Sequence, residues 1–136
     1  MVSKKGATGS KHGKRSFAGQ SMLGEVVGAV LAPVVLGGVS GLLLGASAPV
    51  YWVVQVVAAV GGFFGGFEHH GWRPGLIRGI TGGVLYGTAL LAVRALTGWT
   101  DAIDLGDLPV LLIVITALAG AVAGGLGGAM RARHAR

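Results

Sequence analysis

Charge and cysteine are what this chain has least of. Only 12% of its 136 residues are charged, and none is cysteine; soluble domains carry about 25% charged residues. Without cysteine the chain forms neither disulfides nor thiolate metal sites. It also contains no His-x-x-x-His pair and no phosphate-binding glycine loop, and its polar segments are too short for a catalytic domain. We therefore expect neither an enzyme nor a cofactor.

Long apolar runs take the place of the missing charge. Hydrophobic residues make up 52% of the chain, and no residue from Val26 to Phe67 is charged. About 20 helical residues cross a bilayer, so this run must fold back on itself. The small residues around Ser47, followed by Pro49, mark the turn. The sequence predicts an all-α integral membrane protein, a bundle of four transmembrane helices at about 22–44, 49–67, 74–97 and 108–130.

The charges that remain predict the topology. The chain has eleven Lys and Arg residues and five acidic residues, which gives a net charge of +6. Ten of the eleven cations lie in the tails 1–21 and 131–136 or near the connection 68–75, whereas 98–107 is acidic. Cytoplasmic segments are enriched in Lys and Arg, so we expect a multi-pass protein of the cell membrane with both tails cytoplasmic. The first tail should be disordered, and both tails should contact anionic lipid head groups. We expect no nucleic-acid partner.

Glycine recurs at every fourth position in several predicted helices. In water each glycine in a helix costs about 0.8–1 kcal/mol relative to alanine, but in membranes small residues spaced by four let helix backbones approach closely. We therefore predict glycine-zipper packing. The predicted packing positions are Gly24, Gly28, Gly37, Gly41, Gly61, Gly65, Gly75, Gly79, Gly83, Gly87, Gly120, Gly124 and Gly128.

The glycine pattern also allows an internal repeat. A shift of 59 positions lays Gly24 and Gly28 on Gly83 and Gly87, and Gly61 and Gly65 on Gly120 and Gly124. If the repeat is real, the chain consists of two helical hairpins in the same orientation, an arrangement found in some transporters.

Three polar residues within the predicted spans are candidates for transport: Glu25, Gln55 and Arg94. Arg94 either reaches outward to pair with Asp101 or Asp104, or lines an anion path or gating ion pair. Gln55 either makes an interhelical hydrogen bond, as we expect for Thr81, Tyr86, Thr88 and Thr116 also, or lines a pore.

Glu25 has two interpretations of its own. As an interfacial carboxylate it would pair with Arg73 or Arg78; as a buried one it could exchange a proton for a cation. The stretch Glu25-Val-Val-Gly28, with Asp107-Leu-Pro109 before the last predicted helix, resembles small multidrug-type proton antiporters, although their aromatic motifs in the middle helices are missing. The resemblance implies that Glu25 couples the movement of a proton to that of a cation.

Glu68, His69 and His70 are weak metal candidates. Carboxylate and imidazole bind Zn²⁺ or Ni²⁺, but adjacent residues at a helix end point in divergent directions. We therefore expect a passive titratable cluster at the interface; the alternative is a metal or proton-sensing site, which two facing chains could close.

The sequence favours one functional class and leaves one alternative. We expect a small polytopic protein that forms a homo-oligomer through glycine-rich faces and forms or supports a channel or small transporter. The alternative is a non-transporting scaffold or accessory subunit that packs beside a larger membrane partner. Both need the glycines, so the polar residues must separate them.

Overall fold

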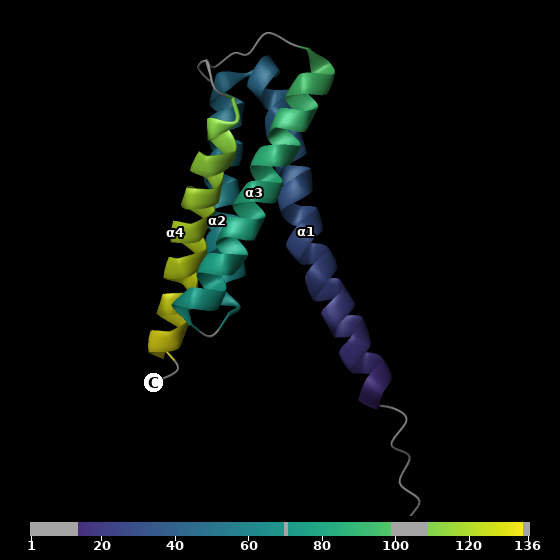
Figure 1. The fold of residues 1–136 in the computed structure, drawn as a ribbon, viewed down its shortest axis with the longest axis vertical. Helices are drawn as coiled ribbons and strands as arrows, with labels where there is room; N and C mark the ends of the chain where they lie inside the picture. Colours follow the sequence, from purple (N-terminus) through teal and green to yellow (C-terminus); the bar gives the residue numbers. More distant parts are fainter. Residues whose placement is uncertain (1–13, 70, 99–108, 135–136) are drawn as a thin grey trace, which may run out of the picture.

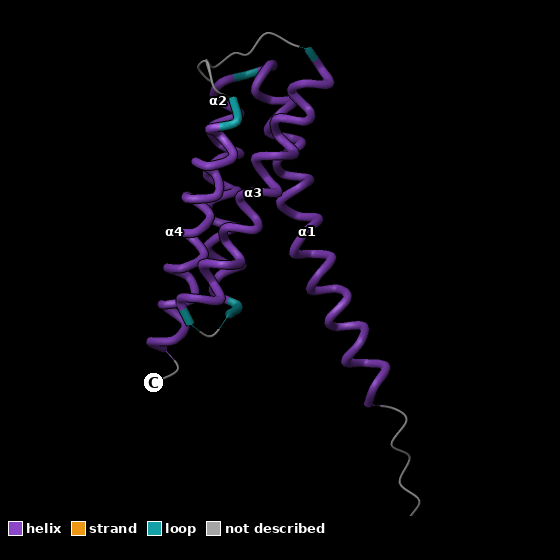
Figure 2. Tube along the Cα trace, viewed as in Figure 1, coloured by secondary structure: helices purple, strands orange, loops and turns teal. Residues whose placement is uncertain are grey.

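A computed structural model of the chain describes residues 14–69, 71–98 and 109–134. In this part of the chain the structure consists of four α-helices (Figure 1, Figure 2). They are α1 (Lys14–Ala46), α2 (Ala48–Phe67), α3 (Trp72–Thr97) and α4 (Leu111–His134). Each has an apolar stretch of 20 to 26 residues, long enough to cross a membrane. The prediction of an all-helical chain with four long apolar helices is confirmed.

The helix ends follow local chemistry. Pro49 lies in the first turn of α2, where its missing N–H is not needed. Helix α4 continues to His134 rather than ending near 130, and Arg131 and Arg133 in its last turn complement the carbonyl groups there. Helix α1 begins at Lys14, within the segment 1–21 that we predicted as a disordered tail, because no proline or turn sequence interrupts it between Lys14 and Pro33. The other predicted tail residues lie outside the described part.

The helices alternate in direction and pack unequally. Helix α3 lies along α4 for most of its length and also packs against α1, whereas α1 and α2 touch little. Figure 1 shows α1 leaning away from the other three helices toward its N-terminal end. The two hairpins are thus packed differently, and the internal repeat stays a prediction.

Helices α3 and α4 approach with their backbones. A Cβ atom added to Gly79 would overlap the carbonyl oxygen of Gly120, and one added to Gly83 would overlap that of Thr116. The relation is reciprocal, since a Cβ atom on Gly120 would overlap the carbonyl oxygen of Gly79. Gly75 and Gly87 continue this face of α3 against α4. Any larger side chain at these glycines requires the two helices to move apart.

A second backbone approach joins α1 to α3. Cβ atoms on Gly37 and Gly41 would meet the carbonyl oxygens of Tyr86 and Leu90. The buried core of the chain lies beside this contact and consists of Leu44, Tyr51, Tyr86 and Leu90. The C-terminal half of α1 is therefore fixed on α3.

Four of the predicted packing glycines have no such neighbour. No atom lies within 4 Å of a Cβ atom built on Gly24, Gly28, Gly61 or Gly65. Gly24 and Gly28 belong to the part of α1 that leans away, and Gly61 and Gly65 belong to the facing stretch of α2. The glycines thus form two groups, one against backbone and one beside open space.

Candidate functional site: a cavity between the four helices

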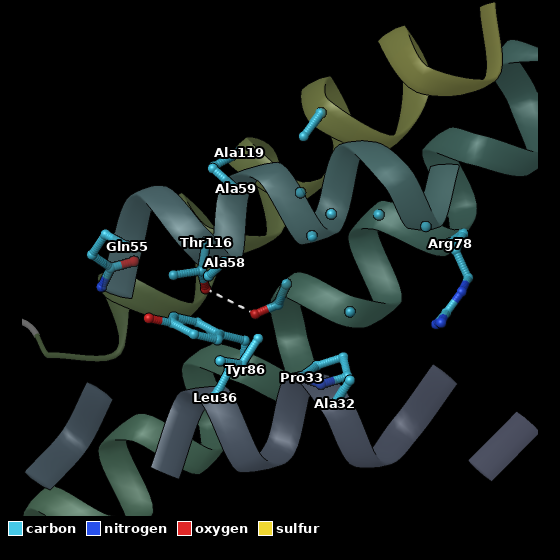
Figure 3. Close-up of a pocket in the computed structure, with 18 of the residues that line it drawn as sticks. Ala32, Pro33, Leu36, Gln55, Ala58, Ala59, Arg78, Tyr86, Thr116 and Ala119 are labelled. Atoms are coloured by element: carbon cyan, nitrogen blue, oxygen red, sulfur yellow. Dashed lines mark hydrogen bonds between the residues drawn. The ribbon is translucent and has the colours of Figure 1, made fainter. Parts of the chain in front are cut away.

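A cavity of about 270 Å³ lies inside the bundle, and all four helices contribute to its wall (Figure 3). Its lining is mostly glycine and alanine. From α1 come Gly28, Ala32, Pro33 and Leu36; from α2 Gln55, Ala58, Ala59, Gly61, Gly62 and Gly65; from α3 Arg78, Gly79, Gly82, Gly83 and Tyr86; from α4 Thr116, Ala119, Gly120 and Ala123. The wall is apolar over most of its length, with exposed backbone at the glycines.

Arg78 supplies the charge in this wall. The side chain is half-buried, and its guanidinium donates a hydrogen bond of 2.9 Å from Nη1 to the carbonyl oxygen of Ala29 in α1. In an α-helix that carbonyl would accept from the N–H four residues later, but residue 33 is proline and has none. Arg78 therefore satisfies the carbonyl that Pro33 leaves without a helical donor. Without water, an unsatisfied backbone carbonyl in lipid costs several kcal/mol.

The other end of the cavity is polar but already hydrogen-bonded. The Tyr86 hydroxyl donates to Ser40 Oγ at 2.5 Å. The Thr116 hydroxyl has three carbonyl acceptors within 3.0 Å, those of Gly83 in α3 and of Leu112 and Ile113 in its own helix. Figure 3 shows Gln55 and Tyr86 at this end and Arg78 at the opposite one. Every buried side-chain nitrogen or oxygen in the described residues has a partner. The cavity is therefore apolar between one cationic end and one neutral polar end.

The cavity opens sideways, between α1 and α2. Helices α1 and α2 touch little, and four exposed lining residues belong to them: Gly28, Ala32, Ala59 and Gly61. Ala119 on α4 is the other exposed lining residue. The outer faces of α2 and α4 are covered by exposed Val, Leu and Phe side chains. In a membrane this opening would meet lipid, because apolar faces of this kind lie in the hydrocarbon. The geometry suits a molecule with an apolar body and an oxygen-bearing anionic group beside Arg78.

The structure places the three transport candidates separately. Gln55 is half-buried and lines the cavity. Arg94 is half-buried near the opposite end of α3 from Arg78, in a separate shallow hollow with Leu91 and Pro109. Its predicted partners Asp101 and Asp104 lie outside the described residues. Glu25 is part of α1, but its side chain lies outside the described ones, so both interpretations of it stay predictions.

The weak metal candidates end α2. Glu68 is exposed and caps the helix, and His69 Nδ1 lies 3.2 Å from the Gly65 carbonyl oxygen, a hydrogen bond within its own helix end. His70 lies outside the described residues. No group of three or more metal-ligating side chains occurs in the part of the chain that the structure describes.

Two residues of the site were missed at the level of sequence. We assigned Arg78 to the topology signal and to a candidate pairing with Glu25, and we did not consider Ser40. The sequence does hold a signal for Arg78: a proline within an apolar helix frees the carbonyl four residues earlier, and a membrane requires a donor for it. For Ser40 the signal is its place between Gly37 and Gly41, on the part of α1 that approaches another helix.

Comparison with protein-family models, with curated proteins and with solved structures gives no match for this chain.

Proposed function

We propose that this chain is a small membrane transport protein, a transporter or the transport subunit of one, whose amphipathic substrate enters the cavity from the lipid. The observation that carries this proposal is the cavity itself: four helices wall it, and it is open between α1 and α2. A scaffold that only packs beside a partner does not need a cavity that reaches between all four of its own helices. An ion-conducting pore is less suited, because the wall is largely apolar.

The glycine spacing supports this architecture. We propose that Gly75, Gly79, Gly83 and Gly87 act as a glycine zipper with α4 inside one chain, which keeps half of the cavity wall fixed. A homo-oligomer is part of the proposal and would form through exposed apolar faces away from the opening between α1 and α2.

The orientation in the cell membrane is part of the same proposal. The N-terminal end of α3, with Arg73 and Arg78, lies at the same end of the bundle as Arg131 in α4 and the beginning of α1 (Figure 1). Cytoplasmic ends are rich in such cations. We place this end, and both termini, on the cytoplasmic side.

A lipid-translocation assay tests the proposal. Purified protein is reconstituted into phosphatidylcholine vesicles containing a fluorescent phospholipid in both leaflets, and dithionite is added to quench the outer leaflet. Translocation should expose the inner fluorophores, so that more than the outer half is quenched. Gly61→Leu should abolish the excess because it fills open space in the cavity, and Gly24→Leu should not, since Gly24 lies in open space outside it.

Quenching that stops at one half for correctly inserted wild-type protein contradicts the transport proposal and favours the scaffold. Equal activity of Gly61→Leu and wild type would also contradict it, because the cavity would then not be the route. Leakage of dithionite itself, measured with a soluble fluorophore inside the vesicles, would instead indicate a pore.

A further inference from the structure

We infer that the cavity selects phospholipids whose head group carries a net negative charge, with a phosphate oxygen on Arg78 and one acyl chain along the glycine-lined wall. The inference rests on the proposed function in taking the cavity as the place where the substrate binds. It adds the chemical class of that substrate and the residue that recognises it.

Charge is the first argument. Arg78 is the only charged residue among those that line the cavity, all of which the structure describes. Its guanidinium carries five N–H donors and binds phosphate through two of them at once. The bond to Ala29 uses one donor, at Nη1. A phosphate at the cavity mouth thus meets a matching cation, whereas the ammonium of a zwitterionic head group meets no lining carboxylate.

Depth is the second argument. Arg78 follows Trp72 by six residues, about 9 Å along a helix axis. Trp72 is exposed at the helix start, where Arg73 lies over its ring, and such aromatic residues sit at the level of lipid head groups. Arg78 therefore lies less than two helical turns below the head-group level, and a phosphate that binds it must enter the mouth of the cavity.

The apolar wall of the cavity is the third argument, because it favours a lipid acyl chain over a free anion. From Arg78 to Tyr86 the α3 wall extends about 12 Å and holds Gly79, Gly82 and Gly83. The hydroxyls of Tyr86 and Thr116 already donate to protein oxygens. A small hydrated anion would lose its hydration shell on entering this wall. The single cation, Arg78, would not compensate for that desolvation cost.

The size of the cavity agrees with one chain. Its volume of about 270 Å³ is below the roughly 300–1,000 Å³ typical of pockets that enclose whole ligands. The remainder of a lipid would stay in the bilayer, and the sideways opening at Gly28 and Gly61 permits that.

Native mass spectrometry of the full chain in detergent tests the inference. The protein is mixed with equimolar phosphatidylglycerol and phosphatidylcholine that have identical acyl chains. We expect wild type to retain phosphatidylglycerol about tenfold better. Arg78→Gln, which removes the charge and keeps a polar side chain, should reduce that preference to near one. Arg73→Gln removes an equal charge from an exposed site outside the cavity and should keep it.

Two further experiments distinguish binding of the acyl chain from binding of the charged head group, and a third measurement detects misfolded variants. Gly61→Leu should lose bound lipid of both classes, and Gly24→Leu should retain it, while circular dichroism checks the helical content of each variant. Glycerol 1-phosphate, the head group chemistry alone, should not displace phosphatidylglycerol even in large excess.

The inference is overturned if Arg73→Gln and Arg78→Gln lower the preference equally, if Gly61→Leu binds lipid as wild type does, or if glycerol 1-phosphate displaces the lipid. Should Arg78→Gln fail to fold, the preference of wild type and Arg73→Gln for phosphatidylglycerol still decides the charge selectivity, and the Gly61 and glycerol 1-phosphate arms decide the role of the acyl chain. Selective binding without translocation contradicts the transport proposal alone, whereas translocation without a preference for phosphatidylglycerol contradicts only the inference made here.

Discussion

Arg78 in α3 stands in for the backbone N–H that Pro33 in α1 does not have. Its guanidinium donates to the Ala29 carbonyl oxygen at 2.9 Å, across 49 residues of sequence. One side chain thus repairs a break in the hydrogen bonding of α1, joins α1 to α3, and places a cation in the cavity wall.

The pairing predicts an energetic coupling between these two residues. Arg78→Met should destabilise the wild-type protein, because the Ala29 carbonyl then loses its donor. In a Pro33→Ala background, residue 33 donates to that carbonyl and the same substitution should matter less, by about 1–2 kcal/mol. Unfolding of the four variants in increasing sodium dodecyl sulfate measures the cycle. Strictly additive effects would show that the two residues act independently.

Backbone contact between α3 and α4 predicts severe sensitivity to size. Gly79→Leu with Gly83→Leu should lower the inserted, folded fraction, since overpacking costs about 1–3 kcal/mol per site. The matched control is Gly24→Leu with Gly28→Leu, which has the same spacing and the same added groups but lies beside open space. Membrane-inserted protein is quantified for both pairs. Equal accumulation of the two pairs would refute the role of the α3 glycines.

The hydrogen bond between the buried hydroxyl groups of Tyr86 and Ser40 predicts that substitutions of these two residues have non-additive effects on stability. Tyr86→Phe leaves the Ser40 hydroxyl without its donor and should cost about 1–3 kcal/mol. Ser40→Ala in the Tyr86→Phe background removes the orphaned group, so the double variant should be no less stable than Tyr86→Phe. Thermal unfolding in detergent reports all three. A double variant that loses the sum of both single effects would contradict the pairing.

The segregation of cations predicts the topology. Because the chain has no native cysteine, single cysteines can be placed at Ser10, Ser47, Thr100 and Ala135. An impermeant thiol reagent added to intact cells should label 47 and 100 only. Labelling at 10 or 135 would show that the termini lie outside the cell, which contradicts the predicted orientation and would place Arg78 in the outer leaflet.

Length and hydropathy were enough to predict the helices, because a run such as Val26–Phe67 has no other way to satisfy its backbone in lipid. They did not predict which glycines are packed. Gly24 and Gly28 have the same spacing as Gly79 and Gly83, yet only the second pair lies against another backbone. Which face meets a neighbour depends on how the helices lean, and spacing within one helix holds no information about that.

The cavity was beyond sequence reasoning for a similar reason. Gln55 was a candidate from its polarity alone, whereas Arg78 gains its role from a carbonyl far away in the chain. Polarity within a span identifies an unusual residue, but the contact that gives it a role is a property of two helices together.

The two kinds of helix contact also divide the bundle mechanically. Helices α3 and α4 touch through main-chain atoms at Gly79, Gly83 and Gly120, so sliding or rotation of one on the other would bring backbone into backbone. We therefore expect α3 and α4 to move together. The part of α1 before Pro33 has no such backbone contact at Gly24 or Gly28, so it is the less constrained side of the cavity. The hydrogen bond from Arg78 to Ala29 is also a mechanical tie, because it joins this part of α1 to α3.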